Sequence, residues 1–345
     1  MRSKRFPLRS AWAALLIVST TAIALGAFSS PGAGQESYSP PRTPWGDPDL
    51  QGKWPATAMV GVPLQRDEVL GTRNELTDEE FAQRVARAEQ QRDADNADFE
   101  LEDAASTPGG TVGGAVSPPP HWLERGEPQR QASLIVDPQN GRIPAQTEEA
   151  QARAAELRAY RERRGPADSY TDRSLYDRCI TRGIAGSVLP VIYNNGNFIV
   201  QAPGYVAFVN EMIHETRIIP LDGRPHVAAD IKLWMGDSRG RFEGDTLVVE
   251  TTNLTDRTGI GLNGGGGRHS DALKVTERFT RIDKDTIAYS MTIDDPKTWT
   301  QPWTMQFPLE RDDEYGMYEY ACHEGNYAMF NILSGARADE RAAGQ

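Results

Sequence analysis

Histidine and cysteine, the residue types that most often bind metals or act as nucleophiles, are scarce in this chain. Its 345 residues include five histidines and two cysteines. None of them lies in a short metal-binding pattern such as HExxH, HxH or CxxC. The glycine run at 264–267 lacks the GxGxxG spacing, and no Walker-type GK[ST] sequence occurs. We therefore expect no cofactor, and no metal site that the sequence itself spells out.

Basic residues are also in short supply. There are 37 Lys and Arg residues against 49 Asp and Glu residues, which gives a net charge of −12 at pH 7. Four basic residues and no acidic residue lie within the first 27 positions, so the rest of the chain is more acidic still. An acidic surface repels phosphate backbones. The composition therefore argues against a nucleic-acid partner.

Long apolar runs are absent except at the start of the chain. Residues 11–27 form an apolar run behind a basic start, and they end in small residues before the Pro- and Gly-rich stretch 29–44. This order is typical of a secretory signal peptide. An uncleaved membrane anchor is the alternative, which a short run containing Ser and Thr supports less well. We expect residues 1–27 to be a signal peptide, and the mature protein to be periplasmic or secreted without a membrane partner.

Both cysteines, Cys179 and Cys322, lie in the part of the chain that would be exported. An oxidising compartment favours a disulfide between them. Such a bridge would close a very long loop, which is worth about 4 to 5 kcal/mol in the chain-entropy model. The alternative is that Cys322, next to His323, acts as a nucleophile or a metal ligand.

Residues 28–175 are predicted to form an irregular arm that carries two helices and wraps the core. The sequence TDEE at 77–80 has the pattern of a capping box and precedes apolar residues at helical spacing. A second helix is predicted over 147–164, where a Gly-Pro pair gives the stop signal. The Gly- and Pro-rich segment 103–120 is predicted to be a loop.

From residue 176 onward the apolar residues recur with a period of two, which predicts strands. The predicted strands cover residues 198–201, 205–219, 246–252, 273–282, 286–293, 303–309 and 315–322. Short strands with tight turns and no helices between them form an antiparallel meander. We therefore predict that residues 176–345 form a mainly β domain, either a curled sheet or a lipocalin-like barrel that could enclose a small ligand. A short helix near 327–334 would follow the last strand.

The segment 210–226 mixes apolar and ionisable side chains on both faces of its predicted strand. His214 would face one way, and Glu215 and Arg217 the other. A buried charge has to be paired, so a Glu215–Arg217 pair is the structural interpretation. The functional interpretation is that His214 lines the cavity as a general acid or base, because histidine side chains titrate near neutral pH.

Two further polar clusters lie in predicted loops. The first runs from the turn at 221–226 to the segment 234–240, which is either a plain hairpin connection or a ligand-contacting loop. The second, at 321–327, follows the last predicted strand, where Gly325 permits a sharp turn. A disulfide would hold it beside the segment 178–183, and rigid support suits both a structural staple and a preorganised site.

Six stretches of the chain carry a distinctive pattern of residues. They are TPWGDPDLQGKW (43–54), RCITRG (178–183), NEMIHETRIIPLDGRPH (210–226), WMGDSRGRFEGDTLVVETTN (234–253), ERFTRIDKDTIAYSMTIDDP (277–296) and ACHEGNYAMFNILSGARADE (321–340). Together they resemble a family of exported bacterial proteins, and the resemblance extends over most of the mature chain. It implies that the three polar clusters belong to one recurrent design, but it implies no catalytic scheme.

The leading hypothesis is an exported enzyme that acts on a small organic molecule without an organic cofactor. It would be a lyase or would cleave a C–O bond by histidine acid/base chemistry, and the substrate class considered is plant-derived aromatics such as lignin aryl ethers. The candidate catalytic residues are His214, His323, Glu215, Arg217, Asp237 and Glu324. The candidate substrate-binding residues are His226, Trp234, Ser238, Arg239, Asn326 and Tyr327.

In this hypothesis His214 or His323 transfers the proton, an arginine stabilises negative charge, and a carboxylate orients the imidazole. A lipocalin-like binding protein that holds an apolar or aromatic ligand is the first alternative. A metal-dependent hydrolase, with its site assembled from distant histidines, is the second. A homo- or hetero-oligomer is compatible with all three.

Overall fold

The computed structural model describes residues 38–96, 111–112, 115–116, 123–261 and 267–344. Ser37–Gln345 forms one compact unit. The predicted signal peptide lies outside the described residues, as does most of the predicted loop at 103–120. Within the described part of the chain, no helix is long and apolar enough to cross a membrane.

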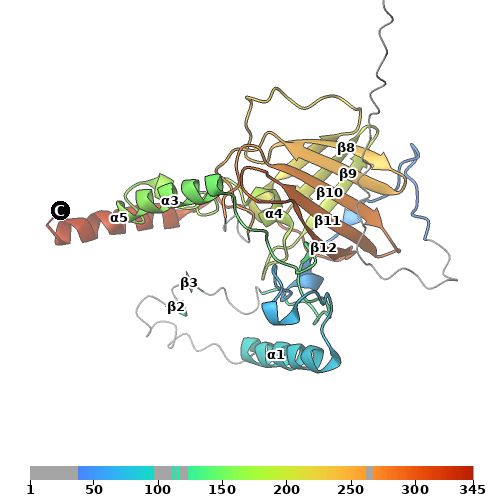
Figure 1. Ribbon diagram of the computed structural model, residues 1–345, viewed down its shortest axis with the longest axis horizontal. Helices are drawn as coiled ribbons and strands as arrows, with labels where there is room; N and C mark the ends of the chain where they lie inside the picture. Colours follow the sequence, from blue (N-terminus) through green and yellow to red (C-terminus); the bar gives the residue numbers. More distant parts are fainter. Residues whose placement is uncertain (1–37, 97–110, 113–114, 117–122, 262–266, 345) are drawn as a thin grey trace, which may run out of the picture. The chain divides into compact units, whose positions relative to one another are not determined.

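Two antiparallel sheets contain most of the strands. The first has the strand order β1 (Gly52–Lys53), β5 (Asn197–Ala202), β6 (Tyr205–Asn210), β7 (Thr216–Pro220). The second has the order β4 (Ile135–Asp137), β12 (Trp303–Glu310), β11 (Thr286–Asp294), β10 (Lys274–Arg281), β9 (Thr246–Thr252), β8 (Asp237–Glu243). Figure 1 shows β8 to β12 side by side, each paired with the next strand in the chain. The predicted mainly β, antiparallel architecture is confirmed.

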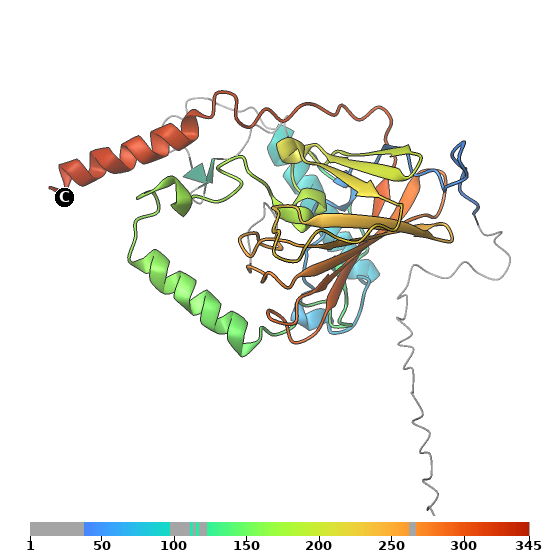
Figure 2. The same cartoon turned by 90° about the horizontal axis from the view of Figure 1, so that it is seen from above.

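The two sheets pack against each other through aromatic rings, and Figure 2 shows the arrangement from a second direction. Phe208 of β6 lies 5.4 Å from Phe279 of β10, centroid to centroid. Tyr289 of β11 and Phe307 of β12 continue the row, with centroid separations of 4.9 and 5.1 Å. All four rings are buried. Within the described residues, neither of these two sheets closes into a barrel.

Apolar alternation explains why these segments form half-buried strands. In β11, Ile287, Tyr289, Met291 and Ile293 are buried, and the residues between them are partly exposed. Strand side chains point alternately to the two faces of a sheet, so one face of β11 joins the core. Burial of each large apolar side chain contributes roughly 1.5–3 kcal/mol.

A buried ion pair connects the two sheets. Arg217 of β7 donates to both carboxylate oxygens of Glu277 on β10, at 2.5 and 2.9 Å. Tyr289 donates its hydroxyl to the same carboxylate at 2.9 Å, and the Arg217 guanidinium lies 5.2 Å from the ring centroid of Phe208. The structural interpretation of the sequence paired Arg217 with Glu215. The structure pairs it with Glu277 instead, because both side chains face the space between the sheets.

The predicted strand at 205–219 is interrupted. Between β6 and β7 lies the short 3₁₀ helix η5 (Met212–His214), in which Ile213 has a positive φ of 58°. Asn210 N donates to Glu215 O at 2.9 Å, which closes the chain around this kink. The prediction of one continuous strand over 205–219 was therefore wrong, and the face predicted for the His214 side chain stays a prediction.

One further strand prediction and one loop prediction also differ from the structure. The segment 315–322 is irregular, and the segment 234–240, predicted as a loop, contains the start of β8. Tyr318 N donates to the carboxylate of Glu211 at 3.1 Å rather than to a neighbouring strand. β8 pairs with β9 along its whole length, so a partner strand outweighs the Gly- and Asp-rich composition of its first residues.

The predicted helices of the N-terminal part are confirmed as α1 (Asp78–Asn96) and α3 (Glu148–Glu162). Thr77 and Glu80 exchange the hydrogen bonds of the predicted capping box, and Thr147 caps α3. α5 (Tyr327–Ala342) extends beyond the predicted end at 334. Elements not predicted include strands β1 and β4, α4 (Gly183–Val188), the 3₁₀ helices η1 (Thr57–Met59), η2 (Glu68–Leu70) and η4 (Tyr170–Asp172), and the antiparallel pair of β2 (Thr111–Val112) and β3 (Ala115–Val116).

The N-terminal part contributes a strand to each sheet. β1 pairs with β5, and β4 pairs with β12. Trp54, directly after β1, is fully buried, and its indole N–H donates to Leu50 O at 2.8 Å. A division of the mature chain at about residue 175 stays a prediction, although residues before that point complete both sheets.

Cys179 and Cys322 form the predicted disulfide, with Cα atoms 5.6 Å apart. The bridge joins the segment before α4 to the turn before α5. A bonded Cys322 is not a free nucleophile or metal ligand. Because disulfides persist in oxidising compartments, the bridge agrees with an exported chain.

We predict that Glu277→Gln lowers the free energy of unfolding by about 3 to 5 kcal/mol, because it leaves Arg217 buried without a counter-charge. Urea unfolding at neutral pH measures this loss. Glu243→Gln removes an exposed carboxylate from β8 and is the matched control, expected to cost less than about 1 kcal/mol. Equal losses for the two variants would contradict the importance of the buried pair.

Candidate functional site

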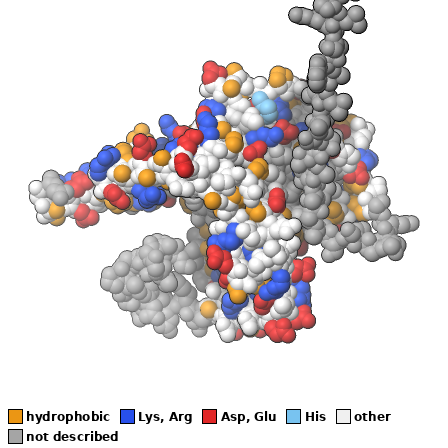
Figure 3. All heavy atoms as spheres, in the orientation of Figure 1, with side chains coloured by type: hydrophobic (Ala, Val, Ile, Leu, Met, Phe, Trp, Pro, Cys, Tyr) orange, Lys and Arg blue, Asp and Glu red, His pale blue; other side chains and the backbone are white. Residues whose placement is uncertain are grey.

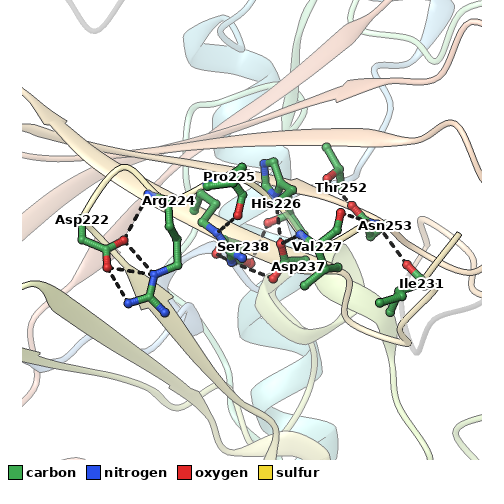
Figure 4. Close-up of polar contacts among 12 residues, drawn as sticks. Asp222, Arg224, Pro225, His226, Val227, Ile231, Asp237, Ser238, Thr252 and Asn253 are labelled. Atoms are coloured by element: carbon green, nitrogen blue, oxygen red, sulfur yellow. Dashed lines mark hydrogen bonds and ion pairs between the residues drawn. The ribbon is translucent and has the colours of Figure 1, made fainter. Parts of the chain in front are cut away.

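His226 and Asp237 form a carboxylate–imidazole pair at the start of β8 (Figure 4). His226 lies on the connection between β7 and β8, and Asp237 is the first residue of β8. His226 Nδ1 lies 3.0 Å from Oδ2 of Asp237. The His226 side chain is 28% exposed and the Asp237 side chain 12%. The structure thus brings together two residues that the sequence proposed for different roles.

Asp237 determines which nitrogen of His226 carries the proton. Burial raises the pKa of Asp237, but hydrogen bonds from Val227 N, Arg239 and His226 outweigh it and bring the pKa below its usual value. Asp237 is therefore ionised at neutral pH and can only accept hydrogen bonds. Nδ1 of His226 must donate, so a neutral imidazole keeps its lone pair on Nε2. A general base requires this tautomer.

The carboxylate of Asp237 is held by three donors. Arg239 donates to Oδ1 at 2.6 Å, and Val227 N donates to Oδ2 at 3.1 Å, beside the imidazole. Arg239 also donates through Nε to Pro225 O at 3.1 Å. These contacts fix the orientation of Asp237 and tie the loop that carries His226 to β8.

Asn253 supports the same loop, and sequence reasoning missed it. Its side-chain amide donates to Ala228 O at 2.9 Å and to Ile231 O at 3.0 Å. Its φ of 60° is positive, a conformation that asparagine tolerates better than most residues. An asparagine directly after a predicted strand was the available signal, but asparagine is common in turns.

Ser238 faces away from the imidazole. Residues 236–240 spell Gly-Asp-Ser-Arg-Gly, which matches the G-x-S-x-G pattern of esterase nucleophiles. That pattern places the serine on a sharp turn between a strand and a helix. Ser238 instead lies within β8, is buried, and hydrogen-bonds through its hydroxyl to Thr251 at 2.8 Å. Asp237 and Arg239 therefore lie on one face of β8 and Ser238 on the other.

Other predicted residues of this region lie apart from the His226–Asp237 pair. Arg217 is buried between the sheets with Glu277, where it stabilises the fold. Glu215 follows η5 and is half-buried, and Trp234 is half-buried on the connection before β8. His214 ends η5, and its side chain lies outside the described part of the structure. The predicted convergence of His214 with His323 stays a prediction.

The predicted cluster at 321–327 lies largely at the surface. His323, Glu324 and Tyr327 are exposed. Asn326 is partly buried, and its amide donates to Asp177 O at 3.3 Å. Asn326 thus ties this turn to the segment that carries Cys179.

A carboxylate cluster that the sequence did not reveal joins three distant segments. The Tyr315 hydroxyl lies 2.9 Å from a carboxylate oxygen of Glu124 and 2.9 Å from one of Glu211. Burial, followed by the charges of Glu124 and Glu211, raises the pKa of Tyr315, so the phenol remains a donor. Further donors to these two carboxylates include Asn195 and Gly196. The cluster anchors the segment that leads to the disulfide.

Three tyrosine hydroxyls meet beside the disulfide. The Tyr176 hydroxyl lies 2.7 Å from that of Tyr193 and 3.3 Å from that of Tyr320. Burial raises the pKa of Tyr176, which keeps the phenol protonated. Arg182, from the RCITRG stretch, is buried with its guanidinium 5.5 Å from the Tyr176 ring centroid. No local spacing in the sequence predicts this meeting.

Within the described residues, no group of three or more His, Cys, Asp or Glu side chains could hold a metal ion. His121 lies outside the described residues. His269 is buried, and its Nδ1 donates to Ser270 O at 2.8 Å while Nε2 lies 2.5 Å from the Thr258 hydroxyl. Burial lowers the pKa of His269, so its ring stays neutral and serves the packing of the fold.

Comparisons with known proteins identify no family for the chain. No family model matches it, and searches of curated proteins and of solved structures gave no match.

We predict that Asp237→Asn destabilises the protein by about 1 to 3 kcal/mol at neutral pH, because a charged acceptor of three hydrogen bonds is lost. The folded pKa of Asp237 lies below the unfolded value near 3.8. Its contribution is therefore complete above that value and is lost as the pH falls through the folded pKa. Urea unfolding from about pH 7 down to about pH 2.5 should show the gap between wild type and variant shrinking below about pH 4.

Asp230→Asn, on the same connection, is the control for this prediction. Asp230 is exposed, so its substitution should leave stability nearly unchanged throughout the pH range. A gap for Asp237→Asn that stays constant down to the lowest pH would contradict the proposed ionised carboxylate.

Proposed function

We propose that the protein is an exported enzyme in which His226 acts as general acid and base on a small organic substrate. The observation that carries this proposal is the 3.0 Å contact between His226 Nδ1 and Asp237, which directs the lone pair of Nε2 away from the carboxylate. Nε2 has no hydrogen-bond partner among the described residues. A histidine oriented by a buried carboxylate is a recurrent device for proton transfer. Sequence reasoning gave this role to His214 or His323, and the geometry favours His226.

Elimination across a C–O bond is the reaction that this pair suits best. Nε2 would take a proton from the carbon adjacent to the carbon that bears the leaving oxygen. The electron pair of that C–H bond would then form a carbon–carbon double bond between the two carbons. The C–O bond would break, and the leaving oxygen would take the proton back from the imidazolium. Asp237, as a positioning residue, would stabilise the imidazolium between the two transfers. Atoms and charge balance within the substrate and His226, as expected for a lyase.

The surroundings of His226 suit an aromatic or otherwise apolar substrate that arrives from solvent. The same connection carries two exposed apolar side chains, Ile231 at 47% and Leu233 at 42% exposure. Asn253 fixes the backbone of this connection at residues 228 and 231, so these side chains project from an ordered loop. An aryl ether could place its ring on them. The proposed substrate class is therefore aryl ethers.

Export is supported by two independent features. The order of basic, apolar and small residues at 1–27 is typical of a cleaved signal peptide. The Cys179–Cys322 disulfide is typical of chains that fold in an oxidising compartment. We therefore propose a periplasmic or secreted enzyme, in keeping with the resemblance of the chain to exported bacterial proteins.

A lipocalin-like binding protein is the alternative from another functional class. It would need the strands to close around a hollow that a ligand could occupy. The space between the sheets holds the Arg217–Glu277 pair and the ring of Phe279, all buried. The acid/base proposal needs no hollow, since His226 lies on a connection outside the sheets. The side-chain packing thus favours the enzyme over the barrel carrier.

We predict that His226→Ala lowers kcat by about 10²- to 10⁴-fold on any substrate that the wild type turns over, because the proton acceptor is removed. Asp237→Asn should cause a loss of similar order, since an amide at this position would favour the wrong tautomer. The measurement is a turnover assay of the purified protein with a panel of aryl ethers, glycosides and esters.

His323→Ala is the discriminating control for this assay, because sequence reasoning made His323 a catalytic candidate. It should retain activity within about 3-fold, whereas His226→Ala should not. For Asp237→Asn, the pH profile of kcat/KM should change shape along with its height, which a purely structural role would not produce. Full activity of His226→Ala would overturn the proposal.

A further inference from the structure

A cleft with a volume of about 670 Å³ lies between α1 and the segments that face it. One wall is mainly apolar and belongs to residues 60–76 and 125–132, with Asp67, Arg125 and Gln129 as its polar side chains. Its side chains include Val60, Val62, Leu70, Leu76 and Ala132. The volume falls within the range of small-molecule sites. No residue of the cleft belongs to the His226–Asp237 pair, so it is a separate place on the molecule.

The opposite wall is a polar stripe along α1. Glu80, Arg84, Arg87 and Gln91 line the cleft at spacings of three and four, which places them on one face of the helix. None of the described side chains of α1 is buried. An amphipathic helix in a globular protein normally buries its inward face. The face of α1 that borders the cleft is instead mainly polar.

Two of the arginines in the cleft have no carboxylate partner among the described residues. Arg84 is half-buried and donates to the backbone carbonyls of Gln129 and Gln131 at 2.7 and 2.8 Å. Arg87 donates to the carbonyl of Gln83 at 3.3 Å. Burial lowers the pKa of Arg84, and the neighbouring charge of Arg87 lowers it further. The two guanidiniums therefore repel each other across the stripe.

The other charged side chains of the cleft have partners. Arg92 and Arg125 form ion pairs with Glu127 and Asp95, at 3.1 and 2.8 Å. Glu80 pairs with Arg73 at 2.8 Å. Asp67 accepts a hydrogen bond from Val69 N in the turn of η2. Asp67 has no cationic partner among the described residues, so two arginines and one carboxylate of the cleft stay without a counter-charge, a surplus of one positive charge.

The protein as a whole carries a net charge of −12, so a site with surplus positive charge is unusual on it. Figure 3 shows acidic and basic side chains interspersed over the face that it draws, including the part formed by α1. General attraction of anions to the surface is therefore weak. An anion that binds here would be held by the local arginines and by the apolar wall.

We propose that this cleft is a binding site for a small organic anion with an aromatic body, such as an aromatic carboxylate or sulfonate. The aromatic body lies against Val62, Leu70 and Leu76, and the anionic group lies toward Arg87. Burial of the rings supplies most of the affinity, and the guanidinium selects the charge. The proposal is independent of the acid/base chemistry at His226.

The probe for this site is anilinonaphthalene sulfonate, whose fluorescence rises in apolar surroundings. Its uncharged relative N-phenyl-naphthylamine has the same ring system without the sulfonate. Wild type should bind the sulfonate saturably and more tightly than the uncharged relative. Arg87→Gln should raise Kd of the sulfonate by about 3- to 5-fold, the size of one exposed ion pair, and leave Kd of the uncharged probe unchanged.

Two alanines of α1 offer a matched pair for a steric test. Ala88 lines the cleft, and Ala86 is exposed outside it. Ala88→Phe fills the cleft and should raise Kd of both probes at least 10-fold. Ala86→Phe lowers the helix propensity of α1 by the same amount but should leave Kd of both probes unchanged. Far-ultraviolet circular dichroism of both variants checks that α1 is retained.

Arg158→Gln, which removes an exposed arginine from α3, is the charge control and should leave Kd of the sulfonate unchanged. Three results would overturn the proposal. The first is binding of the sulfonate that does not saturate. The second is an equal rise in Kd of the sulfonate for Arg87→Gln and Arg158→Gln. The third is an Ala88→Phe variant that binds both probes as tightly as the wild type does. None of these results bears on turnover at His226, so the two proposals fail separately.

Discussion

The buried pair of Arg217 and Glu277 constrains how the two sheets meet. Each charge has left water, and each would be strongly unfavourable without the other. The guanidinium comes from β7 and the carboxylate from β10, so only one relative placement of the sheets satisfies both. The hydroxyl of Tyr289 and the ring of Phe208 complete the surroundings of the pair. Apolar packing alone would tolerate small shifts between the sheets, whereas this contact does not.

The placement of the sheets in turn positions the proposed active site. The chain leaves the first sheet at the end of β7 and enters the second at the start of β8. A Cβ atom on Gly240 of β8 would come within 2.9 Å of Ile219 and within 2.7 Å of Leu221, so a glycine permits this close crossing. The connection between the two strands carries His226, and β8 itself carries Asp237. The imidazole and its carboxylate meet because the crossing brings the loop back over the first residues of β8.

Local pattern predicted a large part of the fold but little of the site. The period-two alternation found β9, β10, β11 and β12 to within one or two residues. It failed at η5, since no glycine or proline in 210–219 marks the kink at Ile213, and at β8, whose first residues resemble a turn until β9 pairs with them. For the site, composition marked His226, Asp237 and Arg239 as polar residues near a loop. It could not pair them, because hydrogen-bond partners depend on how the loop folds back.

Taken by itself, the sequence determined the broad fold class: antiparallel strands, two capped helices in the N-terminal part, an acidic composition and one cysteine pair. The strands and helices follow from side-chain period and capping residues, which act over a few positions of the chain. The charge and the cysteine pair follow from composition alone. The tertiary structure decided the partners: Glu277 for Arg217, Asp237 for His226, and the row of aromatic rings between the sheets. Such pairings join residues far apart in the chain, and their energy exists only once the sheets have packed and excluded water.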